Sequence, residues 1–356
     1  MVNDIVIWAH SECRSVMTLF GEVKRQAKMP VTIALWKYGE EDYVRKRREM
    51  DGQRREQYKK LSLVAVGENL KQGRKLLYSH SGEGCVHVFC VYQVSRVWRR
   101  LMLEAKSMGL RVVVYAEAPC EMCIGWKAGL KRIYYYWCLP WLVGNVAASA
   151  DLFLSQSGRA GMDRLVRLGW NRQKIVPFGY VSDVENLTML TKSSAVYGRG
   201  FLRILHTGVE DVYRGVDVLR TAVTILKDMG VSLEVRCTGG KCTQGRMNEL
   251  YAWADVFVAC GLCEPWGMRV NDAIHSGLPV VVSNGMGVEW MVENYGCGSV
   301  FASGDSKSLA DILFKFATDA RYVAQILLGV QTAHKAWLPT VKAKDFLAAI
   351  SGEHVR

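Results

Sequence analysis

CEPWGMRVNDAIHSGLPVVVSNGMGVEWMVENYGCGSVFASGD, residues Cys263–Asp305, alternates short apolar runs with glycine-rich turns. The apolar runs Val256–Ala259, before this stretch, and Val280–Val282, within it, predict two buried strands. Between these strands, the pattern predicts a helix that begins at Gly267 and ends at Gly277. A further helix is expected after the glycine-rich turn. The order strand, loop, helix, strand, turn and helix is typical of a parallel α/β sheet.

The loop between the first strand and the helix has the residues of an anion and sugar site. Glu264 follows the strand closely, so its carboxylate can accept hydrogen bonds from sugar hydroxyls. The first backbone N–H groups of the helix, at Trp266, Gly267 and Met268, favour a phosphate together with the helix dipole. Asp272 lies further along the helix and can hold a second group of the same ligand. Sugar hydroxyls, a diphosphate and a ribose fit this series of contacts.

The same segment resembles the donor site of retaining GT-B glycosyltransferases of family GT4. That family carries two glutamates in an E-x7-E pattern, then a G-x-P-V-V strand entry, a G-G-x-x-E turn and a late G-D pair. Glu264 and Asp272 stand at the two acidic positions, and Asp272 is one methylene shorter than the usual glutamate. Arg269 stands where the family usually has proline, which adds a cation beside the expected phosphate site. Other matched positions are Gly267, Ala273, Gly277, Pro279, Gly285, Gly287, Glu289, Gly304 and Asp305.

A second part of the resemblance concerns the donor diphosphate. After the strand expected at Leu202–His206, the family has G-R-L and then K-G, whose two cations contact the diphosphate. Gly208 matches the first glycine, and Arg214 stands in for the lysine. Val209 occupies the place of the arginine, so one cation is missing. Arg269 is the candidate replacement.

The resemblance implies an α/β fold of two Rossmann-like domains that face a cleft, with a C-terminal helix that returns to the first domain. We expect a basic, acceptor-side domain at residues 1–178 and a nucleotide-sugar domain at 179–337. The returning helix is expected at 338–356.

The first half offers fewer candidate residues. In the family, a histidine often follows the strand equivalent to Leu110–Ala116 and faces the donor sugar. Glu117 occupies that place here and is a second catalytic candidate, with a turn or helix-capping acid as the alternative. His10 and Ser11, after the first expected strand, are acceptor-side candidates, as is His80 in a region of polar turns.

The charge is distributed unevenly along the chain. Residues 1–178 hold 29 of the 46 lysines and arginines but only 16 of the 34 aspartates and glutamates. The first half is therefore expected to meet a polyanionic surface, either anionic lipid or nucleic acid. Val44–Lys60 is strongly basic, and is either a solvated segment or part of such a surface. Gly125–Val143 sets basic residues beside clustered tyrosines and tryptophans, which suits a membrane interface; single-stranded nucleic acid and a buried helix are its alternatives.

Several other classes of protein are disfavoured. No apolar run reaches transmembrane length, and the N-terminus lacks the pattern of a cleaved signal peptide. The 11 cysteines are an odd number, which favours free thiols in a reducing compartment. We therefore expect a cytoplasmic protein that is peripheral on the inner face of the cell membrane. The CxxC pairs at Cys120 and Cys260 would need two more ligands for zinc, for which His275 and Cys242 are available in principle, and core thiols are the favoured interpretation. No G-x-G is completed to a dinucleotide fingerprint.

The resemblance predicts a retaining, metal-independent glycosyltransferase. It would transfer a sugar from a UDP- or GDP-linked donor to a hydroxyl of a glycolipid or polysaccharide acceptor, with no further cofactor. Glu264 would hold the sugar hydroxyls and Asp272 the ribose, while Arg214 would stabilise the leaving diphosphate. One alternative is a sugar-nucleotide epimerase on the same fold, with acids and bases from the first domain. The other is a non-catalytic basic scaffold that binds a membrane or nucleic acid.

Overall fold

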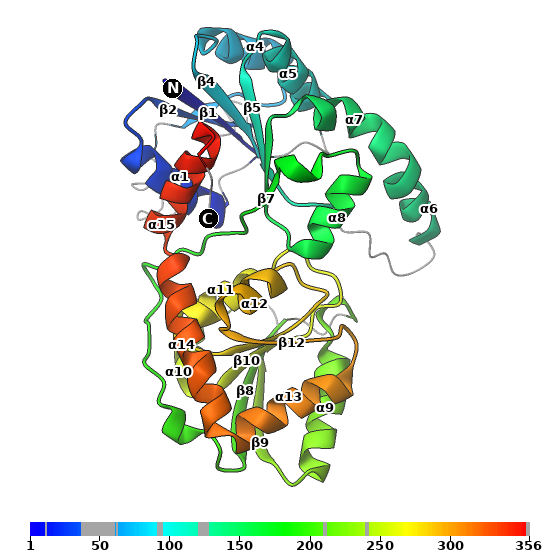
Figure 1. Ribbon diagram of the computed structural model, residues 1–356, viewed down its shortest axis with the longest axis vertical. Coiled ribbons are helices and arrows are strands. Elements are labelled where there is room, and N and C mark those ends of the chain that lie inside the picture. Colours follow the sequence, from blue (N-terminus) through cyan, green and yellow to red (C-terminus); the bar gives the residue numbers. More distant parts are fainter. Residues whose placement is uncertain are drawn as a thin grey trace. The chain divides into compact units, whose positions relative to one another are not determined.

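The computed structural model describes residues 1–10, 13–36, 61, 63–90, 95–119, 128–208, 212–238 and 242–353 (Figure 1). The chain forms two compact units. The first consists of Met1–Ser157, Gly161–Tyr180 and Pro339–Arg356, and the second of Gly158–Ala160 and Val181–Leu338. No helix in the described part of the chain is both long enough and apolar enough to span a membrane.

The first unit is built on a seven-stranded sheet in the order β3-β2-β1-β4-β5-β6-β7. Every strand pair in it is parallel. The strands are β1 (Asp4–Ala9), β2 (Val31–Leu35), β3 (Val64–Ala65), β4 (Cys85–Phe89), β5 (Arg111–Ala116), β6 (Leu152–Ser155) and β7 (Ile175–Pro177). This is the Rossmann order, in which the chain reverses direction across the sheet between β1 and β4.

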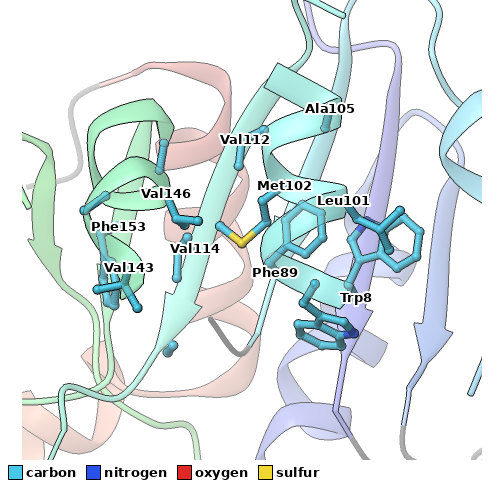
Figure 2. Packing of buried hydrophobic residues seen from close by; sticks show 14 of the residues in the cluster. Trp8, Phe89, Leu101, Met102, Ala105, Val112, Val114, Val143, Val146 and Phe153 are labelled. Carbon is cyan, nitrogen blue, oxygen red and sulfur yellow. The ribbon is translucent and has the colours of Figure 1, made fainter. Parts of the chain in front are cut away.

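Helices belong to this unit as well, and most of them pack on the sheet through apolar faces. They are α1 (Arg14–Gln26), α4 (Leu70–Ser79), α5 (Arg96–Ser107), α6 (Ala128–Ile133), α7 (Leu139–Ser149), α8 (Arg159–Arg167) and α15 (Pro339–Ser351). Figure 2 shows Leu101 and Met102 of α5 beside Val114 of β5 and Phe89 of β4, all buried. The burial of these side chains stabilises the first unit because it removes apolar area from water.

The C-terminal helix α15 belongs to the first unit, as the sequence predicted. Its Phe346 meets three rings of that unit edge-on, those of Phe20, Tyr115 and Phe178, with centroids 5.6, 6.0 and 5.9 Å away. Lys342 of the same helix places its ammonium 3.9 Å from the centroid of the Phe178 ring. This aromatic cluster fixes the end of the chain against α1 and β5.

The second unit has a five-stranded parallel sheet in the order β12-β11-β10-β8-β9. Its strands are β8 (Phe201–Thr207), β9 (Ser232–Thr238), β10 (Val256–Ala259), β11 (Val280–Ser283) and β12 (Gly298–Phe301). Its helices are α9 (Val216–Asp228), α10 (Gln244–Trp253), α11 (Met268–His275), α12 (Glu289–Tyr295), α13 (Ser306–Thr318) and α14 (Ala320–Ala336). The two Rossmann-like domains expected from the sequence are therefore confirmed.

One region of the first unit differs from the sequence prediction. Residues 67–84, expected as polar turns, contain helix α4. The Asn69 side chain caps it by accepting hydrogen bonds from the backbone N–H groups of Lys71 and Gln72 at 2.9 and 3.3 Å. The capping residue Asn69 and the apolar Leu77, which the structure buries, are both helix signals in the sequence. The many polar residues around them favour turns instead.

The second unit also departs from the prediction. The sequence does not predict strand β12, because its Gly298 has poor strand propensity. In the structure this glycine lets β11 come close, since an added Cβ at residue 298 would lie 1.9 Å from Val280 O. The helical residues after Asp305 are divided at Asp319, whose carboxylate caps α14. Residues 183–197 contain a 3-10 turn at Ser194–Val196.

Candidate functional site

The candidate site lies at the carboxyl edge of the second sheet. Strands β8, β10 and β11 are parallel neighbours, so their carboxyl ends share one edge. In open parallel sheets, ligands bind in the loops outside this edge. The loops after β8, β10 and β11 contain or precede the donor-site residues predicted from the sequence.

Two of these loops are hydrogen-bonded to each other along their backbones. Glu264 N–H donates to Gly285 O, and Gly287 N–H donates to Glu264 O, both at 2.9 Å. A Cβ at Gly285 would lie 2.3 Å from Leu262 O, and one at Gly287 would lie 1.8 Å from Pro265 O. Only glycine permits this approach at both positions. These two hydrogen bonds hold the backbone N–H and the carbonyl of Glu264, and therefore fix the point from which its side chain extends.

Helix α11 begins where this paired loop ends. Gly267 precedes it with φ 118°, in a region that other residues rarely adopt, and an added Cβ would lie 2.6 Å from Met286 Cε. Met268 is the first residue of α11. Because the first N–H groups of a helix have no intrahelical acceptor, they are suited to bind an anion.

The side chain of Trp266 has a structural role. It is buried, its Nε1–H donates to Asn271 Oδ1 at 3.0 Å, and its ring stacks on Trp337 with centroids 6.0 Å apart. These contacts fix the loop before α11 against the rest of the domain. The predicted contribution of Trp266 to a ligand site is consequently limited to its backbone.

Arg214 and Glu264, which lie 50 residues apart in sequence, form an ion pair. Arg214 ends a 3-10 turn, Val212–Arg214, and its Nη1 donates to Glu264 Oε2 at 2.7 Å. Both side chains are partly exposed, 43% for Arg214 and 25% for Glu264. A Cβ at Gly208 would lie 3.2 Å from Arg214 Cγ, so this glycine leaves room for the arginine. The structure thus brings together three residues that the sequence assigned to the donor.

Arg269 and Asp272 form a second ion pair one turn apart on α11. Arg269 Nη1 lies 3.4 Å from Asp272 Oδ2. Asp272 therefore has a cationic neighbour on its own helix, and Arg269 is held on the same face. The role of Arg269 as a replacement phosphate cation stays a prediction, and Val209, whose position it would compensate, lies outside the described residues.

The late G-D pair of the motif has a structural explanation in this chain. The carboxylate of Asp305 caps α13 by accepting from the backbone N–H groups of Lys307 and Ser308, both at 3.0 Å. Glu289, in the G-x-G-x-E turn, is mostly buried, and burial raises its pKa.

In the first unit, His10 and Glu117 follow β1 and β5 at the carboxyl edge of their sheet. Tyr180 Oη donates to Glu117 Oε1 at 2.6 Å. Burial, followed by the charge of Glu117, raises the pKa of Tyr180, so the phenol stays protonated and acts as the donor. Glu117 therefore accepts a hydrogen bond from a partly buried tyrosine, and its catalytic role stays a prediction. Ser11 lies outside the described residues.

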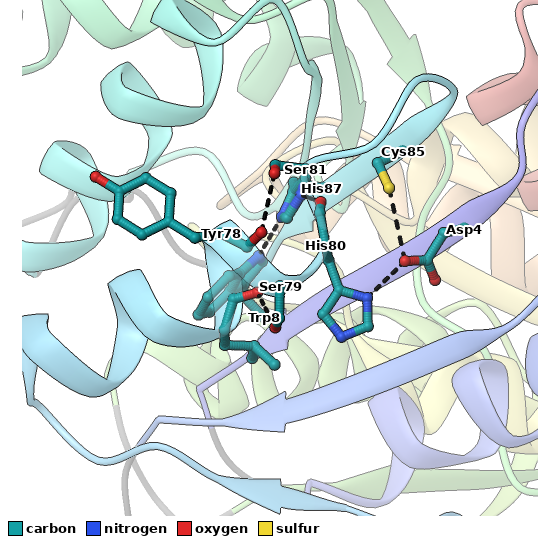
Figure 3. Close-up of polar contacts among 9 residues, drawn as sticks. Asp4, Trp8, Tyr78, Ser79, His80, Ser81, Cys85 and His87 are labelled. Carbon is teal, nitrogen blue, oxygen red and sulfur yellow. Dashed lines mark hydrogen bonds and ion pairs between the residues drawn. The ribbon is translucent and has the colours of Figure 1, made fainter.

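His80 lies at the opposite edge of the same sheet, which corrects its grouping with His10. Its Nδ1 is 2.5 Å from Oδ2 of Asp4, the residue that begins β1 (Figure 3). The neighbouring His87 receives a hydrogen bond from Trp8 Nε1 at 3.1 Å, and its Nε2 donates to His80 O at 2.9 Å. Burial lowers the pKa of His87 to about 4, so it is a neutral core residue. The sequence could not show at which edge His80 lies, because a residue in a turn can lie at either edge of a parallel sheet.

The aromatic segment of the first unit exposes one of its faces. Helices α6 and α7 are joined by a π-helical turn, Tyr134–Cys138. Large apolar side chains along this segment face solvent: Leu130, Ile133, Tyr134, Tyr136, Trp137 and Trp141. Trp137 and Trp141 are 78% and 83% exposed. Most of these residues recur at helical spacing and form one stripe, here called the aromatic stripe, while Leu139 and Val143 of the same segment are buried in the core. The basic segment Val44–Lys60 lies outside the described residues.

Among the described residues, no group of three or more histidine, cysteine, aspartate and glutamate side chains is placed to hold a metal ion. Cys260 is buried, and burial raises the pKa of its thiol, which keeps it protonated. Cys120 lies outside the described residues. Metal independence stays a prediction.

Comparison with known proteins agrees with this geometry. Residues 219–326 match the family Glycosyl transferases group 1, and the match includes the loop of Glu264 and helix α11. The resemblance to GT-B glycosyltransferases is confirmed. No curated protein matches the sequence.

Three solved structures share the fold over almost the whole chain. Anabaena HepE in complex with UDP and glucose has 13% identity and a TM-score of 0.62, covering 98% of this chain and 100% of its own. Sucrose-phosphate synthase from Thermosynechococcus elongatus has 12% identity and a TM-score of 0.65, with 98% of each chain covered. The lipopolysaccharide outer core galactosyltransferase WaaB, in its apo form, has 12% identity and a TM-score of 0.63, with 99% of each covered. At these identities, the likeness establishes the fold alone.

One residue at this edge was not predicted. His206, the penultimate residue of β8, is buried beside Gly208 and Arg214. The signal was a histidine in a mostly apolar strand, two residues before the glycine of the diphosphate pattern.

Gly287→Ala tests the loop pairing. The added methyl group would clash with Pro265 O, so we expect the two loops to separate and the free energy of unfolding to fall by roughly 2–4 kcal/mol. Urea denaturation measures this. Gly245→Ala is the control, because nothing lies within 4 Å of an added Cβ there and alanine favours its helix α10. Equal stability of the two variants would contradict the role assigned to Gly287.

Proposed function

We propose that this protein is a retaining, metal-independent glycosyltransferase of the GT4-like type. It takes a sugar from a nucleoside diphosphate donor and transfers it to a hydroxyl of a glycolipid or polysaccharide. The observation that carries the proposal is the Arg214–Glu264 ion pair, which lies at the carboxyl edge of the second sheet in the loop that leads into α11. This arrangement combines a cation, helix N–H groups and a carboxylate in one domain.

The ion pair suggests how the donor enters. The Arg214 guanidinium is partly exposed and, among the described residues, paired with one carboxylate, so a diphosphate with higher charge can compete for it. Once Arg214 turns to the diphosphate, the Glu264 carboxylate can accept hydrogen bonds from sugar hydroxyls. Asp272, further along α11, would accept from the ribose.

The chemistry follows from where charge develops. As the sugar–phosphate bond breaks, negative charge grows on the diphosphate, and Arg214 with the first N–H groups of α11 would stabilise it. The acceptor hydroxyl would attack from the same face of the sugar, giving up its proton to a donor phosphate oxygen. This accounts for retention without a covalent intermediate on the protein.

The compared structures supply the first ligands to test. HepE was solved with UDP, with UDP and glucose, and with UDP-glucose. Sucrose-phosphate synthase and WaaB also act on sugars, as their names state. UDP and UDP-glucose are therefore the first choices for this chain, followed by GDP and GDP-glucose.

The acceptor is proposed to be lipid-linked, because the first domain suits an anionic membrane surface. The aromatic stripe exposes two tryptophans, whose rings favour headgroup depth. The same domain contains the excess of basic residues. Basic residues with interfacial aromatic side chains give reversible binding without a spanning segment.

Glu264→Gln tests the catalytic assignment. The amide keeps the shape of the side chain but loses its charge, so we expect sugar transfer and donor hydrolysis to fall by at least about 100-fold. Binding of UDP should change by less than about threefold, because Arg214 stays available. Donor turnover and calorimetry measure these, with Glu249→Gln on the exposed surface of α10 as the control. Full activity of Glu264→Gln would show that Glu264 is not part of the active site. If the parent converts the donor to an isomer, the epimerase alternative is favoured. If the parent does not turn over the donor at all, the non-catalytic scaffold is favoured.

Arg214→Ala tests the phosphate contact. Loss of a charge-assisted hydrogen bond should weaken UDP binding by roughly 1.5–3 kcal/mol. Arg246→Ala is the matched control, since Arg246 also pairs with a glutamate in this domain but on α10. Isothermal titration calorimetry gives both affinities. If Arg214→Ala binds UDP and GDP as tightly as the parent, the phosphate site is elsewhere.

Replacing Trp137 and Trp141 together by serine tests the membrane surface. We expect the parent to sediment with anionic vesicles, less so at high salt, and the double variant to bind about tenfold more weakly. Leu328→Ser is the control, because Leu328 is also exposed but belongs to the second unit. Equal binding to neutral and anionic vesicles, or none to either, would leave a soluble acceptor as the better proposal.

A further inference from the structure

His206 has a defined orientation in the second sheet. Its imidazole is buried, with 2% of the residue exposed, and its Nδ1 lies 2.9 Å from the carbonyl oxygen of Val258 on β10. A carbonyl can only accept, so Nδ1 carries the hydrogen and donates it. In the neutral ring, Nε2 is then a hydrogen-bond acceptor.

This acceptor has no partner among the residues that the structure describes. Thr207 Oγ1, from the next residue of β8, is likewise buried and without a partner in that part of the chain. Buried polar groups are almost always hydrogen-bonded, so the unmatched Nε2 at the end of this strand indicates a place where a ligand completes the bonding. The end of β8 is also where the diphosphate pattern begins.

The unmatched nitrogen lies at the proposed donor site. A Cβ at Gly208 would be 3.3 Å from His206 Nε2 and 3.2 Å from Arg214 Cγ. The nitrogen and the stem of Arg214 therefore border the same small space, which only glycine at this position leaves open.

The chemistry of the nitrogen restricts its ligand. Burial lowers the pKa of His206, and the charge of Arg214 acts in the same direction, so the ring is neutral near pH 7. A lone pair attracts a hydrogen-bond donor and repels a phosphate oxygen. Hydroxyl groups are the donors that the ribose and the sugar of a sugar nucleotide provide.

We propose that His206 Nε2 accepts a hydrogen bond from a hydroxyl group of the bound sugar nucleotide and thereby selects ligands that carry a hydroxyl at this point. The inference rests on the proposed function, because it assigns a further contact to the same donor site. The hydroxyl belongs either to the ribose or to the transferred sugar, and the experiment separates these two sources.

Two variants isolate the acceptor. His206→Asn keeps a donor at the δ position for Val258 O but has no atom at the ε position, whereas His206→Gln places an amide oxygen there. We expect His206→Asn to bind its ligand about tenfold more weakly, and His206→Gln to recover to within about threefold of the parent. Calorimetry is done with UDP and UDP-glucose, or with GDP and GDP-glucose if the parent prefers them. Thermal unfolding of each variant reports any loss of fold.

The two ligands identify the source of the hydroxyl. Weakening of both the diphosphate and its glucose conjugate by His206→Asn assigns the contact to the ribose. Weakening of the conjugate alone assigns it to the transferred sugar. Unchanged binding of both ligands to His206→Asn, or equal weakening by Asn and Gln, overturns the proposal.

Arg214→Ala separates this inference from the proposed function. If that variant loses the diphosphate while His206→Asn binds as the parent does, the donor site stands and the inference alone fails. If the parent binds none of the four ligands, the proposed function fails and the inference fails with it.

Discussion

The candidate site depends on one interaction, the backbone pairing between the loop after β10 and the turn after β11. Glu264 both donates to and accepts from the glycine-rich turn, and the glycines at 285 and 287 are what allow two backbones to come so close. This pairing sets the position of Glu264, and the same loop leads directly into α11. The ion pair with Arg214 and the N–H groups of α11 are therefore placed relative to it.

The Arg214–Glu264 ion pair explains how the site can hold two opposite charges when no ligand is bound. Each charge offsets the other while both remain partly exposed, so neither is buried alone. His206, in contrast, is buried near Arg214, and its Nε2 acceptor has no partner in the described part of the chain. A charged pair that can open and a fixed neutral acceptor next to it are complementary to a ligand that has both a diphosphate and hydroxyls.

The first domain differs from the second in its buried and exposed aromatic side chains. Its sheet is buried, its C-terminal helix is fixed by an aromatic cluster around Phe346, and its aromatic stripe faces outward. Exposure of tryptophan side chains to water is unfavourable in free energy unless another surface covers them. Together with the basic composition of this half, this supports a division of roles in which one domain meets the acceptor's surroundings and the other holds the donor.

The sequence by itself determined the features that depend on local order along the chain. The strands around Glu264, the glycines at both ends of α11 and the parallel α/β class follow from apolar periodicity and helix signals, which act over a few residues. Only the tertiary structure decided which distant residues meet. It paired Arg214 with Glu264, placed His80 at the edge opposite His10, turned Trp137 outward and left His206 Nε2 unmatched among the described residues. These outcomes depend on strand order and on which face each side chain occupies, and no local pattern specifies them because they arise from packing between segments far apart in the chain.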